Sequence, residues 1–174
     1  DEKALARVDK YLITRTCPAC DGTRLGERVR STLIDGIDLG EASRLTLTEL
    51  REWVQRVPGL VPEEVAPMAR VIVDEMTEPM DRLVELGLSY LSLDRASSTL
   101  SNGERQRVQL ARAVRNRTTG VLYVLDEPTI GLHPSNVDGV LSMIRELIAD
   151  GNSVVVVDHD TRVLGAADHL IEIG

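Results

Sequence analysis

The sequence predicts an α/β protein whose first part is mostly helical, and two observations carry this prediction. Residues 121–125 (VLYVL) and 154–157 (VVVV) are uninterrupted apolar runs, typical of strands buried on both faces of a parallel sheet. A helical pattern from about residue 136 to 149 lies between them and would form the crossover that a parallel pair requires. Before residue 118 the apolar residues recur at intervals of three and four. We therefore expect a helical part at 1–117 and an α/β part at 118–174.

Composition and charge describe an ordinary globular chain, with 174 residues, 43% hydrophobic content and a net charge of −8. An acidic chain has no general electrostatic attraction for a polyanion, so any nucleic-acid contact must be local or lie elsewhere in a larger protein. No apolar run reaches the roughly 18 residues of a membrane helix, and residues 4–12 have a helical pattern unlike a signal peptide. We expect a cytoplasmic protein without a membrane partner. Because the chain begins with Asp and ends in an expected strand at 168–174, we interpret it as an excised piece of a longer protein.

Capping and turn signals divide the helical part into segments. Thr46 and Glu49 have the spacing of a capping box, so a helix should begin there and end at residues 58–59 (PG). The turn residues Asp35-Gly36 predict a hairpin with strands at 29–34 and 37–39. The apolar periodicity over 62–87 predicts one or two helices, with a kink near Pro79 and an end at Gly87. A further helix should run from the segment 100–104 to about Arg115.

The first candidate site is the pair of carboxylates Asp126 and Glu127, which directly follows the first apolar run. In open α/β sheets, ligands bind at the carboxyl ends of the strands. Adjacent carboxylates there suit nucleotide hydrolysis, since Asp126 could hold Mg²⁺ while Glu127 orients or activates the attacking water. The alternative is that the pair only caps the turn after the strand.

Two further elements suit phosphate binding. Ser101, Asn102 and Gly103 stand at the start of a predicted helix, where free N–H groups and the helix dipole attract an anion. His159 follows the second apolar run, where an imidazole could contact a γ-phosphate. The alternatives are an ordinary helix cap and a structural histidine. The three elements follow one another in the order Ser101, Asp126 and His159, with spacings of about 25 and 33 residues. Three such elements in this order are hard to produce by chance.

This order resembles the signature loop, Walker B strand and switch histidine of ABC-type ATPases. The finer detail is similar to the UvrA family, the damage-recognition ATPases of bacterial nucleotide excision repair. The resemblance covers essentially the whole chain and implies the carboxyl-terminal part of the family's first ATPase domain, with a signature lobe at 1–117 and a Walker B part at 118–174. The segments that carry it are 17–25 (CPACDGTRL), 86–91 (LGLSYL), 120–134 (GVLYVLDEPTIGLHP), 157–160 (VDHD) and 166–174 (AADHLIEIG).

The resemblance implies a role for each candidate residue. Contact with ATP on the P-loop of an opposing ATPase domain is expected for four residues: Ser101, Asn102, Gly103 and Glu104. Asp126, Glu127 and His159 would serve the nucleotide on this domain's own P-loop. Asn102 replaces the usual second glycine of the signature, but asparagine tolerates a left-handed backbone better than most residues, so the loop should keep its shape. The chain has no GxxxxGK[ST] segment, so we expect ATPase activity in the full-length parent and not in this piece alone.

At the level of the whole protein, the resemblance implies damage recognition in which ATP and Mg²⁺ control DNA binding and loading of the next repair subunit by a homodimer. Two alternatives stay open. One is a UvrA-like paralogue in drug resistance or export, and the other is a non-catalytic docking module. An ordinary membrane-transporter ATPase is disfavoured, because its signature lobe would not normally begin with a CxxC turn.

Cys17 and Cys20 form a CxxC pair, which could supply two of the four ligands of a tetrahedral zinc site. The three histidines all lie in the later part of the chain. The resemblance implies that the partner cysteines lie outside this sequence, so Zn²⁺ would find half a site here. The alternatives are free thiols in a turn, or zinc shared between two copies. Two cysteines so close together are no disulfide framework, which suits a reducing compartment.

Overall fold

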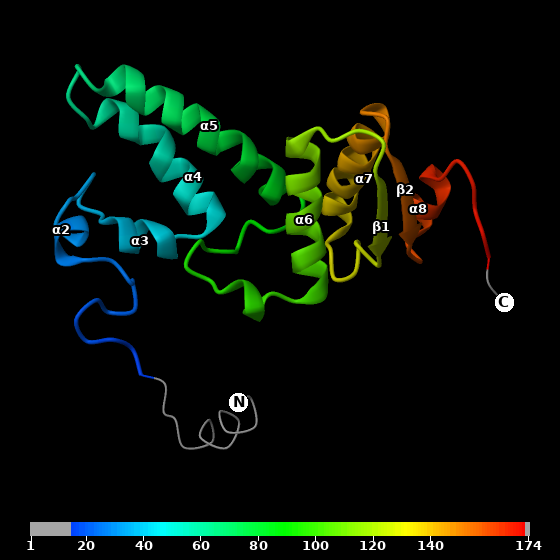
Figure 1. Cartoon of the computed structure of the whole chain (residues 1–174), viewed down its shortest axis with the longest axis horizontal. Helices are drawn as coiled ribbons and strands as arrows, with labels where there is room; N and C mark the ends of the chain where they lie inside the picture. Colours follow the sequence, from blue (N-terminus) through cyan, green and yellow to red (C-terminus); the bar gives the residue numbers. More distant parts are fainter. Residues whose placement is uncertain (1–14, 173–174) are drawn as a thin grey trace.

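The computed structural model describes residues 15–172, so the helix expected at 4–12 lies outside the described residues. A series of helices precedes a final β–α–β unit, which confirms the predicted α/β class (Figure 1). The elements in chain order are α2 (Glu27–Arg30), α3 (Leu39–Arg44), α4 (Leu47–Arg56), the 3-10 helix η1 (Val57–Gly59), α5 (Ala66–Glu85), η2 (Ser97–Thr99), α6 (Asn102–Asn116), β1 (Leu122–Asp126), α7 (Pro134–Ala149), β2 (Ser153–Val157) and α8 (Thr161–Ala166).

Helices α4 and α5 form a long hairpin that extends away from the sheet (Figure 1). The predicted capping box is present, since the Thr46 hydroxyl accepts from the backbone N–H of Glu49 and the Glu49 carboxylate accepts from that of Thr46. Helix α5 runs as a single 20-residue helix with Pro79 inside it. It ends as expected at Gly87, whose φ of 72° lies in the left-handed region that glycine adopts without strain.

The predicted hairpin at residues 29–39 is only partly correct. Asp35 and Gly36 both have positive φ, 55° and 75°, and an isolated antiparallel bridge pairs Ile34 with Ile37. The flanking strands are wrong, because α2 includes residues 29–30, α3 begins at Leu39, and the residues between them form no strand beyond the single bridge. The Asp38 carboxylate and Glu41 form a capping box that starts α3 directly after the turn. Helix capping therefore ends the β pairing after one bridge.

The two strands are parallel, as predicted, but they are covered on one face only. In the register, Leu122 pairs with Ser153 and Asp126 with Val157. The alternate residues of the strands pack with α7 in the main core, and their neighbours are exposed, including Leu122 at 61% and Val124 at 66%. The prediction that both runs are buried on both faces is therefore wrong for the described chain. The strand expected at 168–174 is also absent from its described part, residues 168–172.

One apolar core joins the helical part to the β–α–β unit. The cluster includes Leu50 of α4, Met80 of α5 and Leu110 of α6, together with Leu125 of β1 and Met143 of α7. The division of the chain at residue 117 thus stays a prediction from the sequence. Within residues 15–172, no helix is long and apolar enough to cross a membrane.

Gly139 marks a close approach between α7 and the end of α5. A Cβ at this position would lie 2.5 Å from the Glu85 carbonyl oxygen, so Gly139→Ala must push the two helices apart. We expect this substitution to lower the free energy of unfolding by about 1–3 kcal/mol in urea denaturation. Gly165→Ala in α8 is the matched control, since its Cβ meets nothing within 4 Å and alanine favours a helix by up to about 1 kcal/mol. Equal stability of the two variants would contradict the close approach.

Candidate nucleotide site

The carboxyl ends of β1 and β2 bring two of the predicted catalytic residues together. Asp126 is the last residue of β1, and its parallel partner Val157 ends β2, so the segments that follow lie at one sheet edge. His159 Nδ1 lies 3.8 Å from Glu127 Oε1, although the two residues are 32 positions apart in the chain. Both side chains are accessible, with exposed fractions of 78% for His159 and 45% for Glu127. A ligand at this edge could therefore contact both groups.

The backbone at Glu127 is held in an uncommon conformation. Its φ is 49°, in the left-handed region that non-glycine residues rarely adopt. The Glu127 N–H donates to the Val157 carbonyl at 2.7 Å, which extends the strand pairing by one residue and fixes the turn. Such conformations persist where the surroundings over-determine them, and they are frequent at functional sites. The strained turn directs the chain into the loop 128–132, which we name the post-strand loop.

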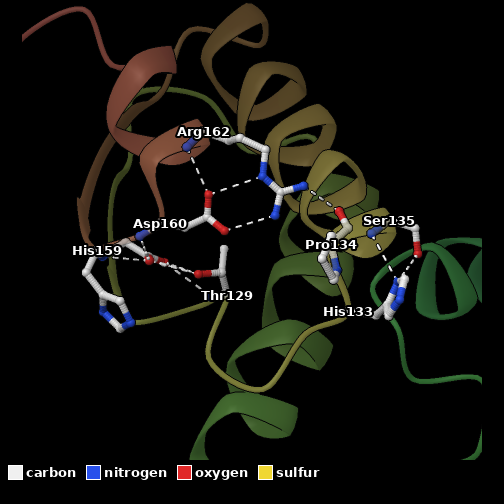
Figure 2. A network of polar contacts seen from close by, with 8 residues as sticks. Thr129, His133, Pro134, Ser135, His159, Asp160 and Arg162 are labelled. Carbon is white, nitrogen blue, oxygen red and sulfur yellow. Dashed lines mark hydrogen bonds and ion pairs between the residues drawn. The ribbon is translucent and has the colours of Figure 1, made fainter.

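Asp158 anchors the post-strand loop to the segment that carries His159. Its carboxylate accepts from the Thr129 hydroxyl at 2.7 and 2.8 Å, and from the backbone N–H groups of His159 at 2.7 Å and Asp160 at 2.9 Å (Figure 2). Burial alone would raise the pKa of Asp158, but the donors from Asp160, Thr129 and His159 hold this pKa below its ordinary value. The sequence assigned no role to Asp158 or Thr129, although both lie in segments that carry the family resemblance. Their pairing spans 29 residues, and no local pattern relates the two positions.

A second set of contacts fixes the start of α8 against α7. Asp160 caps α8 and binds the Arg162 guanidinium through both carboxylate oxygens. The same guanidinium donates to the Pro134 carbonyl at 2.6 Å, while the His133 ring caps α7 by accepting from Ser135 N (Figure 2). These contacts hold the segment around His159 in place from its far side.

The signature loop, residues 100–104, ends in a complete capping box. Ser101 Oγ accepts from the backbone N–H of Glu104 at 3.2 Å, and Glu104 Oε2 accepts from that of Ser101 at 2.6 Å. Ser101 and Asn102 are exposed, whereas Gly103 is buried. In the described chain, the N–H groups of Asn102 and Gly103 have no hydrogen-bond partner, as the first turn of a helix requires for anion binding. Asn102 has no positive φ, so the tolerance for left-handed backbone that we invoked is not needed here.

Glu104 differs from the other signature residues because its carboxylate is held inside the chain. It accepts from the Tyr90 hydroxyl at 2.6 Å and pairs with Arg95 at 3.2 Å, and its residue is only 6% exposed. The Tyr90 hydroxyl, followed by the Ser101 N–H, lowers the pKa of Glu104 to about 2. The sequence assigned no role to either partner, although Tyr90 lies in the segment 86–91 that carries the family resemblance and Arg95 lies in a polar stretch before the signature loop. Glu104 therefore fixes the signature loop from behind, and it does not face the surface beside Ser101.

This lowered pKa predicts an acid-dependent stability. A carboxyl group whose pKa falls on folding stabilises the protein above its unfolded pKa of about 4.3, and this contribution is lost as the pH falls towards about 2. Tyr90→Phe removes the main cause of the shift. In urea titrations, the free energy of unfolding of Tyr90→Phe should therefore lie furthest below that of the wild type near neutral pH, and the difference should shrink below about pH 4.3. Tyr123→Phe, which removes a hydroxyl that contacts the uncharged Thr118 hydroxyl, should show a pH-independent difference, and the same behaviour for Tyr90→Phe would refute this explanation.

The described chain keeps the signature loop apart from the carboxylate pair. Among residues 15–172, no hydrogen bond or ion pair joins Ser101–Glu104 to Asp126, Glu127 or His159. The loop instead packs on the post-strand loop, since a Cβ on Gly103 would lie 3.3 Å from Ile130 Cγ2. Two surfaces thus exist, the sheet edge with Asp126, Glu127 and His159, and the exposed start of α6.

The Cys17 and Cys20 thiols lie in one turn, in which Cys20 N donates to the Cys17 carbonyl at 3.3 Å. The N–H groups of Ala19 and Cys20 lower the pKa of Cys17, which favours a thiolate. Within the described residues, no group of three or more His, Cys, Asp or Glu side chains could surround a metal ion. The pair therefore offers two ligands, and a zinc site here stays a prediction.

The chain is similar to known proteins over nearly its whole length. UvrABC system protein A of Thermus thermophilus is 41% identical over 167 residues, which cover 96% of this chain and 18% of that protein. The same protein of Aquifex aeolicus is 37% identical over 173 residues, which cover 99% of this chain and 19% of that protein. The crystal structure of UvrA2 from Deinococcus radiodurans matches with a TM-score of 0.83 and 36% identity, over 97% of this chain and 22% of that one.

These matches confirm the resemblance to UvrA that the sequence motifs indicate, and the chain spans about a fifth of the length of the curated relatives. The sequence model of the family described as "ABC transporter" matches residues 27–130, from α2 through the signature loop and both carboxylates to the post-strand loop. Because this match covers more than half of the chain, the chain belongs to the ABC transporter family.

Proposed function

We propose that this chain supplies the signature loop and the Walker B strand of an ATPase domain in a UvrA-like protein. ATP binding and hydrolysis in that protein would control recognition of damaged DNA and loading of the next excision-repair subunit. The observation that carries the proposal is the approach of Glu127 and His159 at the carboxyl edge of a parallel sheet. The likeness to UvrABC system protein A over nearly the whole chain supports it.

At the sheet edge, each residue has a separate task. Asp126 offers exposed carboxylate oxygens, the ligand type that Mg²⁺ prefers, and the ion would supply positive charge to the phosphates. Glu127 would orient the attacking water and accept its proton. His159 would donate a hydrogen bond to a γ-phosphate oxygen, for which its exposed ring is free to turn.

The start of α6 would bind ATP held by an opposing ATPase domain. Ser101 can donate its hydroxyl proton outward, because its oxygen serves only as an acceptor within the capping box. The free N–H groups of Asn102 and Gly103 add two further donors. Glu104 would contribute indirectly, because its carboxylate binds Tyr90, Arg95 and Ser101 and carries the wrong charge for a phosphate.

The remaining groups would come from the rest of the protein. No Gly-Lys pair occurs in this sequence, so the P-loop that cradles the β-phosphate would lie outside it, and this chain alone would not hydrolyse ATP. A homodimer would bring further domains together, and DNA would bind mainly outside this acidic chain. Cysteines outside the chain would complete the zinc site at Cys17 and Cys20.

The test is ATP turnover of the full-length protein with undamaged and with ultraviolet-damaged duplex DNA. The repair function predicts that damaged DNA changes the turnover number while undamaged DNA of the same length has a smaller effect. Turnover that ignores both DNAs would favour a UvrA-like paralogue with another task. Absence of any turnover would leave a non-catalytic docking module as the better proposal.

A further inference from the structure

We propose that Arg107 is a positioning residue that holds the signature loop against the post-strand loop. The two loops belong to different surfaces of the site, and the inference rests on the proposed function for what they do with ATP. Arg107 itself lies one turn after Glu104 in α6 and is buried. Nothing in its local sequence distinguishes it from the other arginines of this helix.

The contacts of Arg107 reach across to the post-strand loop. Its Nη1 donates to the carbonyl oxygens of Pro128 at 3.5 Å and of Ile130 at 3.4 Å. Gly103 completes the junction, because a Cβ there would lie 3.2 Å from Arg107 Nη1 and 3.3 Å from Ile130 Cγ2. The signature loop, the guanidinium and the post-strand loop are therefore in direct contact, and a side chain at position 103 would have to displace Arg107 or Ile130 slightly.

A buried arginine is an unfavourable residue at position 107 if its role is only to stabilise the fold. It is only 5% exposed, and its Nε is buried without a hydrogen-bond partner in the described chain. Burial lowers the pKa of Arg107, which shows that desolvation opposes its charge, although the nearby Tyr90 and Glu104 favour the charged form. A buried charge with incomplete pairing is often no more stable than an apolar residue of similar volume. What an apolar residue cannot supply is the polar link to two carbonyl groups on another loop.

The contact between Arg107 and the post-strand loop connects two other sets of hydrogen bonds. Glu104 holds Ser101 on one side of Arg107, and Thr129 binds Asp158 next to His159 on the other. The post-strand loop is thus held from α6 by Arg107 and from the segment after β2 by Asp158. Loss of Arg107 would release one clamp and change the position of the signature loop relative to the sheet edge.

The experiment compares Arg107→Met and Arg107→Lys with Arg112→Met in the full-length protein. Arg112 is an exposed residue of the same helix and is the matched control. Hydrogen exchange should become faster in Arg107→Met at two places, the Glu104 amide and the amides of Ile130 and Leu132, which are hydrogen-bonded in the native loops. ATP turnover should show a kcat about ten- to a hundred-fold lower with an unchanged KM, since small displacements of groups remote from the chemistry have effects of this size. Arg107→Lys should recover part of the lost kcat.

Each outcome decides the inference. Faster exchange in both loops with the split between kcat and KM supports it, whereas unchanged exchange in residues 128–132 overturns it. Faster exchange with a wild-type kcat also overturns it, because the contact would then be merely structural. If the wild type hydrolyses no ATP, the proposed function fails, and hydrogen exchange alone still decides whether Arg107 joins the two loops. Should Arg107→Met not fold, Arg107→Lys provides the same comparison.

Discussion

Glu127→Gln is expected to lower the ATP turnover number of the full-length protein by about 10²- to 10⁴-fold, the usual range for loss of a general base. Glutamine keeps the size of the side chain but cannot accept a proton from water. The fold should be unaffected, since the side chain is 45% exposed and, among the described residues, its one possible ion pair is the 3.8 Å contact with His159. The cost of the positive φ is nearly the same for both residues. Nucleotide binding should also survive, because Asp126 and the P-loop hold the nucleotide.

Steady-state turnover and ATP binding by calorimetry together test this expectation. Glu75→Gln is the control, since Glu75 is an exposed acidic residue on α5, far along the chain from the sheet edge. The control should keep wild-type kcat and affinity. A Glu127→Gln enzyme with kcat within about two-fold of wild type would remove Glu127 from the proposed role.

The sequence predicts most helices and both strands, because these depend on local signals. Thr46 and Glu49 form the capping box that their spacing of three positions predicts, and Ser101 with Glu104 has the same spacing. The parallel crossover then places Glu127 and His159 at one edge without any knowledge of side-chain contacts. This part of the site follows from strand order alone.

Where local signals compete, the sequence misleads. Asp35-Gly36 forms the expected turn, but the capping box at Asp38 starts a helix where a strand was predicted. The apolar runs of β1 and β2 indicate burial on both faces, yet a sequence pattern cannot show which surfaces a neighbour covers. Whether a strand face is exposed depends on which other segments of the chain pack against it.

The contacts between loops were not predictable from the sequence. Arg107 binds carbonyl groups 21 and 23 residues away, and Asp158 binds Thr129 across 29 residues. No periodicity or motif relates such partners, because their approach depends on how α6, β1 and β2 meet. The same reason explains Glu104, which the motif presents as a ligand and which the fold turns inward to Tyr90 and Arg95. Residues of one motif can therefore have different roles.

Asp158→Asn is expected to have the second large effect, on stability and on turnover together. The carboxylate accepts four hydrogen bonds from three residues, whereas an asparagine offers one acceptor oxygen and two unwanted donors. Hydrogen bonds to charged groups contribute about 1.5–3 kcal/mol each, so losing part of the set should lower the free energy of unfolding by about 2–4 kcal/mol at neutral pH. Because the pKa of Asp158 is lowered on folding, this difference should shrink as the pH falls below about 3.9.

A double-mutant cycle with Thr129→Val tests whether Asp158 acts through the post-strand loop. Thr129→Val removes the hydroxyl that binds Asp158, so the two substitutions should lose less stability together than the sum of their separate losses. Asp74→Asn, an exposed position on α5, controls for the change of charge. Strict additivity would mean that Asp158 stabilises only its own segment. Because His159 N and Thr129 share the same carboxylate, non-additivity accompanied by a lower kcat would show that the clamp on the post-strand loop also sets the position of His159 at the sheet edge.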